Sequence, residues 1–66
     1  MIIKSDEIIK KLRELTGLSQ SKFAKYLDIP VANIQRWEQG VVNPPKYVLC
    51  LIKKVMLNDG YILNNI

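Results

Sequence analysis

A nine-residue segment in the middle of the chain carries side chains suited to reading another molecule by hydrogen bonds. Projected as a helix, residues 31–39 place Ile34, Trp37 and Glu38 on one side, with Val31 at its margin. The opposite side holds only small or polar groups: Ala32, Gln35, Arg36 and Gln39, with Asn33 at its edge. Arginine pairs with guanine, glutamine with adenine, and small apolar groups contact the thymine methyl. This face therefore suits the edges of DNA bases, although the same composition also fits a solvated helix face.

Catalytic and metal chemistry is not expected from this composition. The chain has no histidine and one cysteine, so a nucleophilic triad would lack its base and a thiolate zinc site would lack its ligands. Glycine-rich phosphate loops and usefully spaced carboxylate pairs are also missing from the sequence. We therefore expect a protein that is not an enzyme and that needs no cofactor or metal.

Length and charge indicate one small domain with an anionic partner. A chain of 66 residues, 48% hydrophobic, is expected to fold as a single domain over residues 1–66. Ten Lys and Arg against six Asp and Glu give a net charge of +4, which favours an anionic partner without naming one. The longest uncharged apolar run, residues 47–52, is too short to cross a bilayer, and the start lacks the pattern of a signal peptide. A cytoplasmic setting is therefore expected.

Capping and breaking residues divide the chain into helices. Ser5 and Ser19 are suited to cap helices over residues 5–16 and 20–27, and Gly17 and Gly40 to end helices. The remaining expected segments are a helix from about 30 or 31 to 39, one from about 44 to 57 capped by Asn43, and a last helical turn over 61–66. The pattern predicts an all-α bundle of four to five helices.

Two short helices separated by a three-residue break resemble a known DNA-binding motif. The residues that carry the resemblance are Leu18-Ser19-Gln20, Phe23-Ala24, Leu27, Ile29, Ile34, Arg36-Trp37-Glu38-Gln39-Gly40 and Asn43-Pro44-Pro45. Over nearly its whole length the chain resembles the lambda-repressor/Cro-like (XRE-family) helix-turn-helix proteins, and most closely the DNA-binding domains of toxin–antitoxin antitoxins. It departs from the family where Asp28 replaces the usual glycine and Pro30 the usual Ser or Thr cap.

The resemblance implies a sequence-specific regulator of transcription, a bacterial or phage repressor acting at the nucleoid. The helix-turn-helix would span about 20–39, and its second helix, about 31–39, would enter the major groove of double-stranded DNA. Base contacts are expected from Arg36, Gln35, Ala32, Val31 and Asn33. Phosphate contacts are expected from Gln20, Ser19, Lys22, Asn43 and Lys46, although for the lysines simple solubility remains an alternative. Arg13 and Glu38 are expected to form a structural ion pair.

The fourth expected helix is apolar on several sides. A core stripe is expected from Tyr47, Val48, Leu51, Ile52 and Val55, widened by Leu49 and Met56, with Cys50 as a small buried residue. Such a helix needs more cover than a small monomer provides. Either Tyr61-Ile62-Leu63 folds over it, or a second copy does. We expect a homodimer through the fourth helix and the C-terminus on a palindromic operator. The alternative is an antitoxin or protein-interaction module of the same fold, acting mainly through a protein partner such as a toxin.

Overall fold

Four α-helices joined by short loops make up the part of the protein that the structure describes. The computed structural model describes residues 5–62, and the side chains of residues 7–62. Its helices are α1 (Ser5–Thr16), α2 (Gln20–Leu27), α3 (Val31–Gln39) and α4 (Lys46–Asn58), and the described residues form no strand. The predicted all-α class is confirmed. Of the expected last turn, residues 61 and 62 form a bend rather than a helix, and residues 63–66 lie outside the described part.

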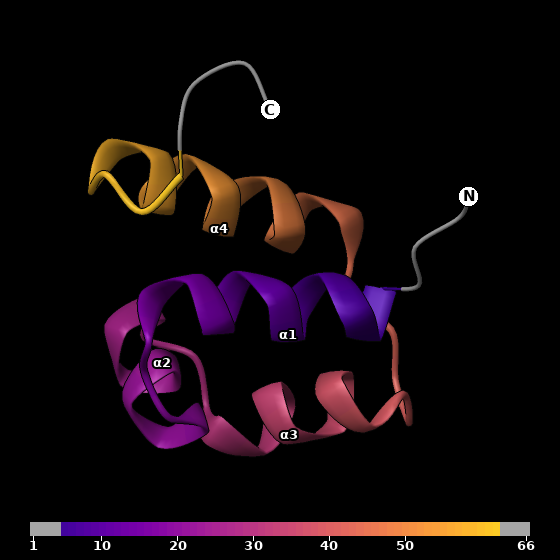
Figure 1. Ribbon diagram of the computed structural model, residues 1–66. Helices are drawn as coiled ribbons and strands as arrows, with labels where there is room; N and C mark the ends of the chain where they lie inside the picture. Colours follow the sequence, from indigo (N-terminus) through magenta and orange to yellow (C-terminus); the bar gives the residue numbers. More distant parts are fainter. Residues whose placement is uncertain (1–4, 63–66) are drawn as a thin grey trace.

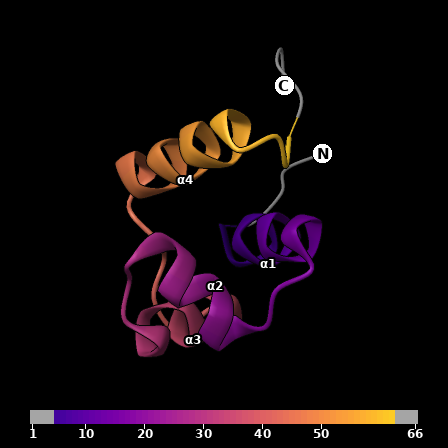
Figure 2. The same cartoon turned by 90° about the vertical axis from the view of Figure 1, so that its left-hand side faces the viewer.

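The helices form a group of three, α1, α2 and α3, with α4 beside it (Figures 1 and 2). In Figure 1, α1 lies between α4 on one side and α3 on the other, with α2 crossing at one end. The close backbone approaches join α1, α2 and α3, and the turned view in Figure 2 shows α4 set apart from this group. The fourth helix contacts the core through its side chains, and its backbone does not approach the other helices as closely.

Local chemistry explains where α2 and α3 begin and end. The Ser19 hydroxyl oxygen accepts the backbone N–H of Lys22 at 3.2 Å and so caps α2, as predicted. Asp28 adopts the left-handed conformation at φ 59°, which Asp tolerates better than most residues, and ends the helix. Pro30 then precedes α3 without any side-chain cap, and Gly40 ends that helix at φ 77°. The three-residue break of a helix-turn-helix is formed without its usual glycine.

Among the described residues, nine buried hydrophobic ones, drawn from all four helices, form the core. They are Ile9, Leu12, Phe23, Ala24, Ile34, Trp37, Leu49, Ile52 and Met56. The i, i+4, i+7 spacing of Ile8, Leu12 and Leu15 predicts that these residues form the core stripe of α1. This prediction is wrong for Leu15, whose side chain is 52% exposed, whereas Ile9 is fully buried. The inner face of α1 follows Ile9, Leu12, Arg13 and Thr16, at i, i+3, i+4 and i+7. Arg13 and Thr16 are polar and half-buried, so a pattern of apolar residues alone does not predict this face.

The buried face of α4 also differs from the expected one. Leu49, Ile52 and Met56 form it, whereas Tyr47, Leu51 and Val55 are exposed and Val48 is half-buried. Apolar residues occur on both sides of this helix, so periodicity could not choose between them.

The start of α4 is set by the two prolines before it. Pro44 is buried and Pro45 is the N-cap, so the helix begins at Lys46 and is not capped by Asn43. The expectation that Cys50 is buried is likewise wrong, because the thiol lies on the exposed side of the helix.

The end of α4 is attached to α2 through aromatic and polar contacts. The Tyr26 hydroxyl donates a hydrogen bond to the Asp59 carboxylate, and the Tyr61 ring meets the Tyr26 ring edge-on with centroids 5.7 Å apart. Ile62 is half-buried against the core, so the first residues after α4 cover part of the core. Leu63, expected to join them, lies outside the described residues.

Replacing Tyr26 by Phe should alter the response of stability to alkaline pH. Burial and the hydrogen bond to Asp59 raise the pKa of Tyr26 from about 10 to about 12. The raised pKa means that the folded state favours the neutral phenol. This stabilisation is complete below pH 10 and is lost as the pH rises toward 12. We expect Tyr26→Phe to cost about 1 kcal/mol at pH 8. The difference from wild type, measured by urea unfolding, should shrink between pH 10 and 12; a constant difference would contradict the assignment.

Candidate nucleic-acid interface

The two faces of α3 differ in exposure as well as in chemistry. Ile34 and Trp37 are buried in the core, so Trp37 is not available for stacking on bases. The outer face is exposed and consists of Ala32, Gln35, Arg36 and Gln39. These side chains are small or polar, as base-edge contacts require. The structure therefore leaves a nine-residue helix with one face fixed in the core and the other free to enter a groove.

The five candidate base-reading residues are not equally accessible. Ala32, Gln35 and Arg36 are exposed, whereas Asn33 and Val31 are half-buried. Val31 also packs against the hydrophobic core. The first three residues therefore present their side chains fully, and the other two only in part.

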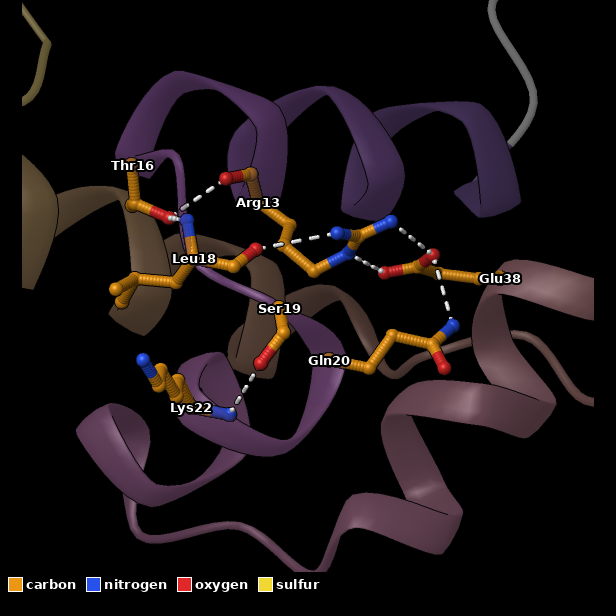
Figure 3. A network of polar contacts seen from close by, with 7 residues as sticks. All are labelled: Arg13, Thr16, Leu18, Ser19, Gln20, Lys22 and Glu38. Atoms are coloured by element: carbon orange, nitrogen blue, oxygen red, sulfur yellow. Dashed lines mark hydrogen bonds and ion pairs between the residues drawn. The ribbon is translucent and has the colours of Figure 1, made fainter.

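An ion pair joins α3 to α1. Arg13 Nε donates to Glu38 Oε2 at 2.7 Å and Arg13 Nη2 donates to Glu38 Oε1 at 3.1 Å, an arrangement with two parallel bonds (Figure 3). Arg13 Nη1 also donates to the Leu18 carbonyl oxygen at 3.1 Å, which attaches the loop before α2. The sequence interpretation pairs these two side chains, and the structure brings them into direct contact.

Gln20 belongs to the same network, which the sequence interpretation missed. Its Nε2 donates to Glu38 Oε1 at 3.1 Å, so the first residue of α2 is bonded to the last turn of α3 (Figure 3). No local pattern announces a contact between residues 18 positions apart. Because one amide hydrogen is used by Glu38, Gln20 retains one hydrogen for a phosphate.

Arg13 neutralises the negative charge of Glu38, which lies beside the exposed face of α3. The Glu38 side chain is 6% exposed and that of Arg13 is 19% exposed. The pKa of Arg13 is raised above its ordinary value, chiefly because the guanidinium hydrogen-bonds to Glu38. An unpaired carboxylate at this place would repel DNA, and the bidentate arginine removes that penalty.

The candidate phosphate-binding residues fall into two groups. Ser19, Gln20 and Lys22 lie at the start of α2, where backbone N–H groups and the helix dipole favour an anion. Asn43 and Lys46 are exposed at the loop and first turn leading into α4. No described hydrogen bond joins the two groups, so the structure brings together the first three but not all five.

Among the described residues, no group of three or more His, Cys, Asp and Glu side chains is placed to hold a metal ion. Their helices also include none with the length and apolar character needed to cross a membrane.

Replacing Glu38 by Gln should destabilise the protein by up to about 3 kcal/mol. That figure is the lower end of the cost of breaking a buried pair, because Arg13 keeps some contact with water. The measurement is the midpoint and slope of urea unfolding. Glu14→Gln, the same charge change at an exposed position of α1, should cost less than about 0.5 kcal/mol.

The double replacement Arg13→Met with Glu38→Leu extends this test. It leaves neither charge unpaired and should lose less stability than Glu38→Gln alone. Equal losses for Glu38→Gln and Glu14→Gln would show that the network is not structural.

Comparison with known families agrees with this geometry. The family model described as Helix-turn-helix matches residues 9–56, more than two thirds of the chain. Comparisons with curated proteins and with solved structures give no significant match. The matched span runs from the buried Ile9 to the buried Met56 and includes the network and all of α3. The chain therefore belongs to the lambda-repressor-like (XRE) helix-turn-helix family of DNA-binding domains.

Proposed function

We propose that the protein is a repressor that binds double-stranded DNA sequence-specifically, with α3 in the major groove. The observation that carries this proposal is the exposed face of α3, on which Ala32, Gln35 and Arg36 stand free while Ile34 and Trp37 are fixed in the core. Base readout needs a small set of polar side chains on a rigid element. The Arg13–Glu38 pair supplies rigidity by joining α3 to α1.

In this proposal the contacts divide by type. Arg36 makes the main base contact, a bidentate pair with guanine, and Gln35 and Ala32 read its neighbours, with Val31 and Asn33 at the edge of the site. Phosphate contacts come from Ser19, Gln20, Lys22, Asn43 and Lys46. The domain over residues 1–66 acts as one unit, at the nucleoid of a bacterium or on phage DNA.

We further propose that two copies bind a palindromic operator, paired through α4 and the C-terminus. A single copy offers few cations near its DNA-reading face, so one half-site gives weak binding. Pairing doubles the contacts, with half-sites spaced by one helical turn of DNA. The exposed apolar side chains of α4, among them Tyr47 and Leu51, support a contact there.

A second candidate function rests on the same helix. An antitoxin-like or interaction module acts mainly through a protein partner, and the exposed apolar side chains of α4 suit such a partner as well as a second copy. A shift assay on random duplex DNA distinguishes the two functions. A DNA-binding regulator shows salt-dependent binding to any duplex, whereas a pure interaction module shows none.

Replacing Arg36 by Ala should weaken operator binding by about 1–3 kcal/mol and relax specificity at one base pair. The operator is first obtained by selecting bound sequences from a random duplex library. Affinities are then measured for the operator and for each single-base-pair variant. Unchanged discrimination at every position would refute the role of Arg36.

Lys46→Ala is the matched variant for a phosphate contact. It removes one positive charge, as Arg36→Ala does, but should weaken binding to all sequences alike. The slope of log affinity against log salt should fall by about one. Loss of discrimination at one base pair in Lys46→Ala would reverse the assigned roles.

Pairing through α4 should become stronger as salt is added. The helix carries three lysines and no acidic residue, so two copies repel each other at low ionic strength. Analytical ultracentrifugation at high micromolar protein should show more dimer at 0.5 M than at 0.05 M salt, and Leu51→Ser should reduce it at both. Only monomer under both conditions would refute the proposed homodimer.

A further inference from the structure

Exposed apolar side chains gather on one segment of the chain. Of the eight large hydrophobic residues exposed in the described part of the protein, six lie between residues 41 and 57. They are Val41, Val42, Tyr47, Leu51, Val55 and Leu57. The remaining two, Leu15 and Tyr61, stand apart in sequence. The concentration on one loop and one helix distinguishes this surface from the scattered exposed hydrophobics of an ordinary domain.

Three of these residues form a continuous line on α4. Tyr47, Leu51 and Val55 follow one another at i, i+4 and i+8, and are 68%, 54% and 41% exposed. The line, here called the apolar stripe, is separate from the buried face formed by Leu49, Ile52 and Met56. The helix thus has one apolar face in the core and a second one in solvent.

One lysine borders the apolar stripe, and two more lie farther round α4. Lys54 is three residues from Leu51 and seven from Tyr47, so it lies beside the stripe, whereas the helical period places Lys46 and Lys53 on the side of α4 away from Leu51. All three lysines are exposed, and α4 contains no Asp or Glu. Asp59, directly after the helix, accepts the hydrogen bond from Tyr26. Within residues 7–62 the ion pair that forms is Arg13–Glu38, so none of these lysines is neutralised by a described carboxylate.

This charge pattern decides between two kinds of occupant. A second copy covers the apolar stripe but brings together two helices that each carry three lysines and no carboxylate, which costs free energy. A helix with apolar residues along one face and Asp or Glu beside them covers the stripe, pairs with Lys54 and is attracted by the charge of the other two lysines. The acidic helix matches both the apolar stripe and the positive charge of α4, whereas a second copy matches only the apolar stripe.

We propose that α4 binds an acidic amphipathic helix of another protein, in competition with a second copy of this chain. The partner's apolar residues pack on Tyr47, Leu51 and Val55, and a carboxylate beside them meets Lys54, while Lys53 adds to the positive charge of the helix. Figures 1 and 2 both show α4 and α3 at opposite ends of the molecule, so a partner on α4 does not have to cover the outer face of α3. This inference rests on the proposed pairing. The partner displaces the second copy and therefore lowers affinity for a palindromic operator, but not for a single half-site.

A pair of synthetic peptides tests this proposal. The first is a 21-residue amphipathic helix with Leu on one face and Glu beside it, and the second has Lys in place of every Glu. Binding of each fluorescent peptide to the full chain is measured by anisotropy at 0.05 M and 0.5 M salt, below the concentration at which the peptide self-associates. The acidic peptide should bind at least about tenfold more tightly than the basic one at low salt, and added salt should weaken it. Equal binding of the two peptides would overturn the proposal.

Charge-reversal variants separate the α4 surface from the net charge of the protein. Lys53→Glu with Lys54→Glu should reverse the preference toward the basic peptide. Lys10→Glu with Lys11→Glu makes the same change at exposed positions of α1 and should leave the preference as in wild type. Leu51→Ser should weaken the acidic peptide without reversing the preference. Equal effects of the two charge reversals would overturn the proposal, and circular dichroism confirms that each variant is folded.

The effect on DNA is measured separately with the same peptide. The acidic peptide should lower affinity for the selected palindromic operator and leave affinity for an isolated half-site unchanged. Peptide binding with no effect on the palindrome would overturn the competition. If wild type binds the peptide but no duplex DNA, the proposed DNA-binding function is refuted and the proposed binding surface on α4 is supported. If it binds DNA but not the peptide, the binding surface on α4 is refuted and the DNA-binding function is supported.

Discussion

The Arg13–Glu38 ion pair is the contact on which the arrangement of the three N-terminal helices depends. Glu38 accepts two bonds from Arg13 of α1 and one from Gln20 of α2, while Arg13 also holds the Leu18 carbonyl. The left-handed Asp28 fixes the angle between α2 and α3 at one end, and this network fixes it at the other. With both ends held, α3 can present its outer face without support from a ligand. The bonds from Arg13 and Gln20 to Glu38 are directional, so they hold the helices in one relative orientation, which apolar contacts alone do not do.

The fold places the exposed polar face of α3 and the exposed apolar side chains of α4 on different helices. The α1, α2 and α3 group approaches closely through its backbones and presents the polar face of α3. The fourth helix reaches the core through Leu49, Ile52 and Met56 and leaves a second apolar face in solvent. A chain of 66 residues has little surface to spare, so exposing Tyr47 and Leu51 has a cost in solubility that a contact would recover. In the proposal made above, the three lysines of α4 favour an acidic partner over a second copy.

Local sequence alone determined the bounds of α2 and α3 and the division of α3 into a buried and an exposed face. Ser19 as a cap, Gly40 as a terminator and the break at residues 28–30 gave α2 and α3 their observed bounds, because these signals act within one turn of helix. The division of α3 into a core side and an exposed side followed from the positions of Ile34 and Trp37, since a helix with few apolar residues has only one way to bury them.

Only the tertiary structure decided the questions in which two faces compete. In α1, the burial of Ile9 and exposure of Leu15 follow from Arg13, which must face Glu38 and so sets the rotation of the whole helix. In α4, apolar residues on both sides make the buried face a matter of packing rather than of pattern. The bond from Gln20 to Glu38 joins residues far apart in sequence and exists only because α2 and α3 cross. Local signals therefore set where each helix begins and ends, whereas long-range contacts set how each is turned.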